Sequence, residues 1–142
     1  MDLSTALPWA AQRSNAVLIT IRADGRPQSS DISYWLTDGS EPVFEISLTA
    51  TRAKTVNMRR DPRVVLHITE PSSWSYLSFD GTVELSPPTT EANDATADAL
   101  VAYYENVAGK AHPDWDEYRA AMIAEQRLIA RFRPASVVGQ IK

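Results

Sequence analysis

Apolar and polar residues alternate along much of residues 16–86, as they do in half-buried β-strands. Residues 16–23 are almost continuously apolar, which predicts a strand that is buried on both faces. The dipeptide Asp24-Gly25 predicts a tight hairpin turn directly after it. Further strands are expected at residues 26–36, 42–48, 63–69 and 74–86, the last interrupted at Asp80-Gly81, with closing strands at residues 128–132 and 136–141.

Four segments predict helices instead of strands. They are residues 4–13, a short segment after Thr51, residues 89–107, and the residues that follow a capping box at Asp114 and Glu117. Mostly sequential strands with helices inserted late are typical of a mainly β barrel with flanking helices. We therefore expect a single domain, residues 1–142, that folds as a closed or nearly closed antiparallel barrel.

The segment 51–62 concentrates basic side chains in a chain whose net charge is −4. With Thr51 as N-cap, the side chains of Arg52, Lys54 and Asn57 would lie on or near the first turns of the short helix. Free backbone N–H groups and the helix dipole attract anions there, and arginine with lysine is suited to phosphate. Taken alone, the cluster favours an exposed helix face. Its position between two strands of an acidic chain favours a site for a small anion.

Several kinds of site are excluded by residues that the chain lacks. No cysteine is present, which removes disulfides, thiolate metal sites and cysteine nucleophiles. His67 and His112 have no partner at metal-ligand spacing, so we predict no metal site. We expect His67 to be a packed strand residue and His112 a solvated loop residue. Because no nucleophile or nucleotide-binding motif occurs, a bound cofactor must supply the difficult chemistry if the protein is an enzyme.

The charge balance and the length of the apolar runs bear on partners and location. An acidic chain has no general attraction for nucleic acid or for an anionic membrane. No apolar run approaches the roughly 20 residues that cross a bilayer, and residues 1–12 lack the pattern of a signal peptide. We therefore expect a cytoplasmic protein that binds a small molecule, with no nucleic-acid or membrane partner.

Three groups of residues are candidates for binding a cofactor. The first is the basic cluster, to which Ser47 on the preceding strand adds a hydroxyl group. The second is Trp74 with Tyr76, which either lies against a planar ring or forms an ordinary core or interface pair. The third is the polar run 25–31 after the hairpin turn, which taken alone favours an exposed edge strand.

Together these residues resemble the split-barrel flavoproteins of the pyridoxamine 5'-phosphate oxidase superfamily. The resemblance is closer to the actinobacterial branch that uses the deazaflavin coenzyme F420, and it covers nearly the whole chain. The motifs are Asp24-Gly-Arg-Pro-Gln28, Ile46-Ser47, Arg52-Ala-Lys-Thr55 with Asn57, Arg59-Arg-Asp-Pro62, Trp74-Ser-Tyr76 and Trp115-Asp-Glu-Tyr-Arg119. The resemblance implies a six-stranded antiparallel split β-barrel and a homodimer with the cofactor at the subunit interface.

The resemblance also implies roles for individual residues. The cofactor phosphate and the chain next to it would be held by Ser47, Arg52, Lys54 and Asn57. The deazaflavin ring would be approached by Pro27 and Gln28 with Asp31 nearby, and Trp74 and Tyr76 would line the pocket. Arg59 and Arg60 lie further along the helix and are either solvated or close to an anionic cofactor tail.

The function that this resemblance implies is transfer of a hydride from reduced F420 to a small conjugated organic substrate. No side chain stands out from the sequence as the proton donor. Residues 136–142 lack the Arg-x-His substrate motif of pyridoxamine-phosphate oxidases, so oxidation of vitamin B6 is not expected. Two alternatives stay open: an FMN-dependent oxidase or reductase of the same fold, and a non-catalytic protein that binds F420 or a flavin.

Overall fold

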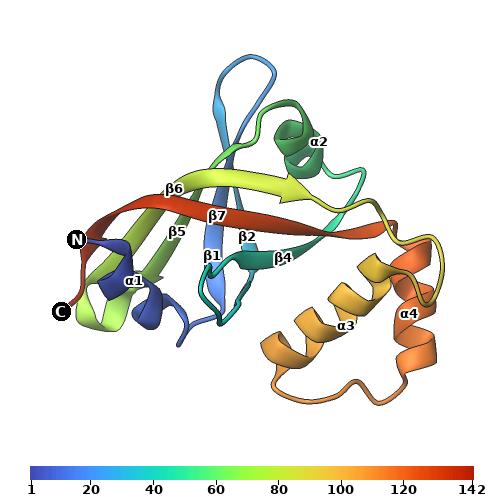
Figure 1. Ribbon diagram of the computed structural model, residues 1–142. Coiled ribbons are helices and arrows are strands. Elements are labelled where there is room, and N and C mark those ends of the chain that lie inside the picture. The colour runs from blue at the N-terminus through green and yellow to red at the C-terminus, as the bar shows by residue number, and fades with distance from the viewer.

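A computed structural model describes all of residues 1–142 (Figure 1). Its strands form one seven-stranded antiparallel sheet in the order β2-β1-β5-β6-β7-β4-β3. The strands are β1 (Asn15–Ile21), β2 (Pro27–Ser33), β3 (Trp35–Leu36), β4 (Phe44–Thr49), β5 (Arg63–Glu70), β6 (Ser75–Leu85) and β7 (Arg127–Gln140). The helices are α1 (Leu3–Ala10), α2 (Ala53–Arg60), α3 (Ala95–Ala108) and α4 (Trp115–Ala124), with a short 3-10 turn at Pro71–Ser73. The mainly β architecture with flanking helices is therefore confirmed.

The prediction of six strands is wrong, because the strand expected at residues 26–36 is divided at Tyr34. The side chain of Tyr34 is buried, its hydroxyl donates to the Ala10 carbonyl at 2.7 Å, and its N–H donates to the Ser14 carbonyl at 2.7 Å. These contacts turn the backbone away from β1. The next two residues, Trp35 and Leu36, pair with β4 instead.

The same division curls the sheet. Strands β2 and β3 stand at opposite ends of the strand order, yet only Tyr34 separates them in the sequence. The sheet must therefore bend until its two edges come together, which gives a split barrel.

A single long strand, β7, replaces the two closing strands that were predicted at residues 128–132 and 136–141. The pairing of β7 with β6 shifts register at Asp80-Gly81, where an interruption was expected. A Cβ atom on Gly81 would lie 2.0 Å from the Arg133 carbonyl oxygen, so only glycine fits this close approach of the two strands.

The inner face of the curled sheet carries the main core. Four rings meet there, with Phe44 lying 5.1 Å from Tyr34, 5.2 Å from Phe79 and 5.8 Å from Phe132 between centroids. Helix α1 covers part of this core with buried alanines. None of the helices is long and apolar enough to span a membrane.

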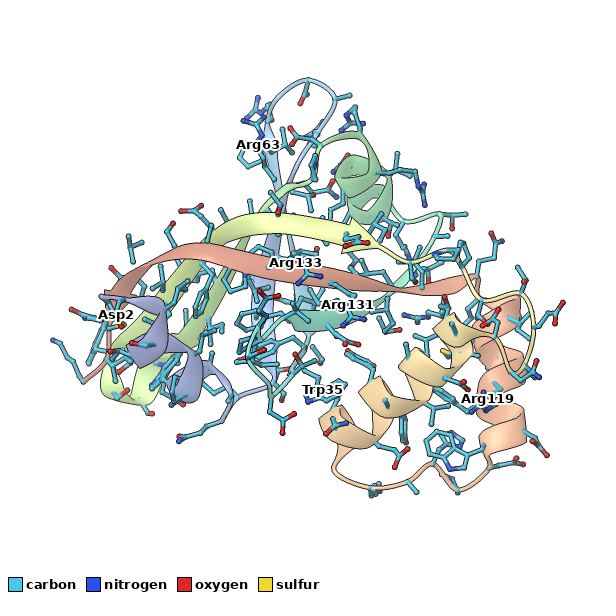
Figure 2. The ribbon with its side chains drawn as sticks, in the orientation of Figure 1. Asp2, Trp35, Arg63, Arg119, Arg131 and Arg133 are labelled. Atoms are coloured by element: carbon cyan, nitrogen blue, oxygen red, sulfur yellow. The ribbon has the colours of Figure 1, made fainter.

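Helices α3 and α4 form a hairpin that packs on β4 and β7, at the lower right of Figure 1. A second, smaller apolar cluster joins the hairpin to the sheet through Leu100, Tyr118, Met122 and Ile129. Trp35 lies beside α3 (Figure 2). The solvated position expected for His112 is wrong, because its ring packs 5.1–5.8 Å from the rings of Tyr104, Trp115 and Tyr118. These helices bring the beginning of β7 close to β4.

Candidate functional site

Three hollows on the outer face of the sheet adjoin one another through shared lining residues, and we call the three together the groove. The central hollow, about 420 Å³, is lined by residues of β1, β2 and β5. It shares Asp31, Ile32 and Ser33 with a second hollow of about 280 Å³, which we call the cationic hollow. It shares His67 and Thr69 with a third hollow of about 360 Å³, which we call the aromatic hollow.

The register of the strands explains why Asp31 and His67 face the same groove. Val17 of β1 pairs with Asp31 of β2 on one side and with His67 of β5 on the other. Directly opposite residues in an antiparallel pair point to the same face of the sheet. A carboxylate and an imidazole therefore stand on the two sides of Val17, about 10 Å apart by strand spacing.

Three basic side chains line the cationic hollow. Arg52 and Lys54 come from the start of α2, and Arg127 comes from the start of β7, with Ser47 and Thr49 of β4 between them. Burial lowers the pKa of the Lys54 amine, and the neighbouring charges of Arg52 and Arg127 lower it further. The positive charges thus repel one another, and a bound anion would relieve that repulsion.

Helix α2 begins differently from the prediction. Its N-cap is Arg52, not Thr51, and no side chain caps the helix. The free N–H groups of the first turn are therefore not occupied by a capping side chain. The hydroxyl of Thr55 donates to the Thr49 carbonyl at 2.8 Å and fastens the helix to the end of β4.

Asn57 does not line the groove, because its amide is used inside the protein. Its Nδ2 donates to Thr20 Oγ1 at 3.1 Å and to Gln28 Oε1 at 2.9 Å. Its Oδ1 accepts from Arg60 Nη2 at 3.1 Å, and the same Nη2 donates to the Ile21 carbonyl at 2.9 Å. Asn57, Gln28 and Arg60 therefore tie α2 to the β1–β2 hairpin.

The remaining candidates are dispersed. Pro27 is exposed at the beginning of β2 and lies outside the groove lining, and so does Gln28. Arg59 lines a separate hollow behind α2 together with Met58 and Pro62.

Trp74 and Tyr76 form a wall of the aromatic hollow together with His67. The Trp74 side chain is 78% exposed, and its backbone has a φ of 58°, which is unusual for a large residue. Two hydrogen bonds hold this conformation: the Trp74 N–H donates to the Pro71 carbonyl, and the Trp74 carbonyl accepts from Gln140 at 2.9 Å. The ring of His67 lies 5.7 Å from that of Tyr76. A large aromatic surface is thus presented on a firmly held backbone.

Comparison with known proteins places the chain in a family. Residues 7–137 match the family model of pyridoxamine 5'-phosphate oxidase. The chain belongs to this family. The match confirms the resemblance that was drawn from the sequence motifs, and it agrees with the split barrel seen here.

Solved structures of the same fold bear different names. A conserved hypothetical protein, Rv2991 from Mycobacterium tuberculosis, is similar with a TM-score of 0.75 and 21% identity, over 98% of this chain and 84% of that one. An F420 reductase is similar with a TM-score of 0.67 and 23% identity, over 92% and 94%. The heme storage protein HutZ from Vibrio cholerae has a TM-score of 0.65 and 16% identity, over 97% and 94%. At these identities the likeness concerns the fold of the pyridoxamine 5'-phosphate oxidase family.

Flavins and F420, which proteins of this fold bind, carry a phosphate and a planar ring system. The side chains of Arg52, Lys54 and Ser47 line the cationic hollow, and the central hollow beside it has room for a ring. Three basic side chains around one hollow are the observation that favours an anion at this end.

Two groove residues were missed by the sequence reasoning. His67 was expected to be packed, but it is only half-buried and lines two hollows. Arg127 carried no signal, because its proximity to Lys54 depends on the pairing of β7 with β4.

Proposed function

We propose that this protein is an oxidoreductase that uses reduced F420 and transfers a hydride to a small conjugated organic substrate. The observation that carries the proposal is the row of three adjoining hollows, with basic side chains at one end and aromatic side chains at the other. The chain matches the family model of pyridoxamine 5'-phosphate oxidase, and an F420 reductase has a similar fold. Both support a redox cofactor with a phosphate group.

In this proposal the cationic hollow holds the cofactor phosphate through Ser47, Arg52 and Lys54. Asn57 and Gln28 contribute indirectly, because their hydrogen bonds fix α2 against the β1–β2 hairpin. Pro27 begins the strand that carries Asp31 to the groove. When bound, the deazaflavin supplies the hydride.

The protein's own residues orient and shield the reactants. The central hollow presents the apolar surface of Val17 between Asp31 and His67, which restricts how a planar ring can lie. Trp74 and Tyr76 offer faces against which a flat ring can stack. Orientation and removal of water are the two contributions that such a site makes to catalysis.

We further propose that the protein is a homodimer with the groove at the subunit interface. Exposed apolar side chains gather near the aromatic hollow. Ser78 of β6 pairs with His67 on one side and with Val138 of β7 on the other, so Val138 lies on the same face of the sheet as His67. The Val138 side chain is 62% exposed, and Trp74 and Tyr76 are exposed beside it. Aromatic residues left open to solvent are typical of surfaces that a partner covers.

Titration of the purified protein with F420 and with FMN tests the choice of cofactor. The proposal expects tighter binding of F420. Tighter binding of FMN would favour the alternative of an FMN-dependent oxidase or reductase, since FMN also has a phosphate and a planar ring.

Single-turnover mixing tests catalysis separately from binding. The protein loaded with reduced F420 is mixed with a panel of quinones, enones and tetrapyrroles, and loss of the hydride is followed by absorbance. Oxidation of the cofactor by at least one substrate class is expected. Saturable binding without hydride loss to any of them would instead indicate a non-catalytic binding protein.

A further inference from the structure

Arg127 reaches the cationic hollow from a part of the chain that is distant in sequence from the basic cluster. It is the first residue of β7 and pairs with Thr49, which also lines the hollow. In Figure 1 the end of α4 runs directly into β7 at the right of the barrel, and the loop from β4 to α2 lies on the same side. The basic side chain thus enters the groove from β7, directly after the α3–α4 hairpin.

The guanidinium of Arg127 is held in one orientation by an acid. Its Nε and Nη2 atoms both donate to Glu125 Oε1, at 3.1 and 3.0 Å. Its Nη1 amine makes no hydrogen bond within the protein, so part of its donor capacity is free. An arginine that is oriented by one carboxylate and has free donors is preorganised for a second anion.

The backbone at this junction is also fixed. Glu125 is the C-cap of α4, and Gln126 follows with a positive φ of 53°. The Gln126 carbonyl accepts from the Ala50 N–H at 2.9 Å, which ties the junction to the segment ahead of α2. Because this left-handed conformation costs free energy in a residue other than glycine, its presence is consistent with a functional constraint.

A second tie connects the hairpin to the opposite wall of the hollow. The Tyr103 hydroxyl on α3 donates to the Ser33 carbonyl at 2.9 Å, and Ser33 lines both the cationic and the central hollow. The hairpin is thus bonded to the groove on two sides. Its position relative to Arg52 and Lys54 is therefore set by direct contacts.

We propose that Arg127, oriented by Glu125, is a third basic ligand of the cofactor's phosphate ester beside Arg52 and Lys54, and that the junction between the α3–α4 hairpin and β7 is in this way part of the cofactor site. The inference rests on the proposed function, because it takes the anion to be the phosphate of a flavin or deazaflavin. Arg127 of β7 would thus act on the same phosphate as Arg52 and Lys54 of the basic segment. Residues 47–54 and Arg127 are brought together by the pairing of β7 with β4, so the proposed site is complete only with β7 in place.

The test compares Arg127→Ala with the control Arg119→Ala. Arg119 lies within the same hairpin, away from β7 (Figure 2), and forms an ion pair with Asp98 at 2.9 Å. The exposed fractions of the two arginine side chains are similar, 31% for Arg127 and 24% for Arg119, but only Arg127 lines the groove. Dissociation constants are measured for FMN with riboflavin, which differ only in the phosphate, and for F420 with the deazariboflavin that lacks both the phosphate and the anionic tail beyond it. Thermal unfolding of each variant checks the fold.

Arg127→Ala is expected to weaken binding of the phosphate-bearing ligands about ten- to a hundredfold, as for loss of a charge-assisted hydrogen bond. Binding of riboflavin and of the phosphate-free deazariboflavin should be unchanged, and Arg119→Ala should affect neither ligand pair. Equal weakening with and without the phosphate would overturn the proposal, since it would show an indirect effect through the fold.

The variant Lys54→Ala separates this inference from the proposed function. If Lys54→Ala weakens binding of the phosphate forms and Arg127→Ala does not, Arg127 is not a ligand and the proposed function stands. If neither variant weakens binding, the cationic hollow is not the phosphate site and both proposals fail.

Discussion

At the scale of single residues, Lys54 and Asn57, which are less than one helical turn apart on α2, have different roles. Lys54 lines the groove, whereas the Asn57 amide is buried and bonded to three other side chains. Substitutions at the two positions should therefore separate binding from stability.

Lys54→Ala should weaken cofactor binding by about 1.5–3 kcal/mol, because it removes one charge-assisted phosphate contact. The free energy of unfolding should change by less than about 0.5 kcal/mol, as for most surface substitutions. Titration of cofactor fluorescence measures the first and urea denaturation the second. Lys110→Ala, an exposed control beyond the end of α3, should change neither. An unchanged dissociation constant in the Lys54 variant would show that the basic cluster is only a solvated face.

Asn57→Ala should lower the free energy of unfolding by about 1–3 kcal/mol, because it removes the bonds to Thr20 and Gln28 and one of the two acceptors of Arg60. Asn106→Ala is the matched control, since the Asn106 amide is exposed and donates only to a carbonyl one turn earlier on α3. Urea denaturation measures both. Equal stability of the two variants would contradict the structural role given to Asn57.

At the scale of elements, α3 starts later than its alanine-rich sequence predicts. Asp94 is the N-cap, and its carboxylate accepts hydrogen bonds from the N–H groups of Thr90, Glu91 and Ala97 and from the Thr89 hydroxyl. These hydrogen bonds, led by that from Thr90, lower the pKa of Asp94 to about 2. These hydrogen bonds hold the residues just before Asp94 in a non-helical turn, so the helix begins only after Asp94.

Asp94→Ala should lower the free energy of unfolding by about 1–2 kcal/mol at neutral pH, as for loss of an N-cap. Since the pKa of Asp94 is lower in the folded protein than in the unfolded chain, its contribution is fully present above about pH 4. It is lost as the pH falls toward about 2. The difference between wild type and variant, measured by urea denaturation at several pH values, should shrink over this interval. A difference that stays constant down to pH 2 would argue against the charged cap.

Local patterns predicted most elements of this fold and the residues of the basic segment. They could not predict the division of the strand at Tyr34, because that depends on contacts with Ala10 and Ser14. Neither could they predict Arg127 in the cationic hollow, which depends on the register between β4 and β7. Site residues that are close together in the sequence could thus be predicted, whereas site residues that are brought together by strand pairing could not.

At the scale of the whole molecule, the proposed dimer makes a direct prediction. Val138→Asp should dissociate the dimer, because it places a charge on the exposed apolar surface beside the aromatic hollow. Val56→Asp is the control, since Val56 is also exposed but lies on α2. Sedimentation velocity at several concentrations distinguishes the two states. A wild-type protein that sediments as a monomer, or a Val138 variant that stays dimeric, would contradict this interface.

The place of β7 in the sheet has a consequence for how the chain folds. This strand follows the other six in the sequence, yet it lies between β6 and β4 in the strand order. Until it emerges, β1, β2, β5 and β6 can pair with one another, while β4 lacks its long partner. Such unpaired edges are prone to aggregate in a nascent chain. Pairing of residues 127–140 with both β6 and β4 therefore closes the barrel and completes the groove in a single event.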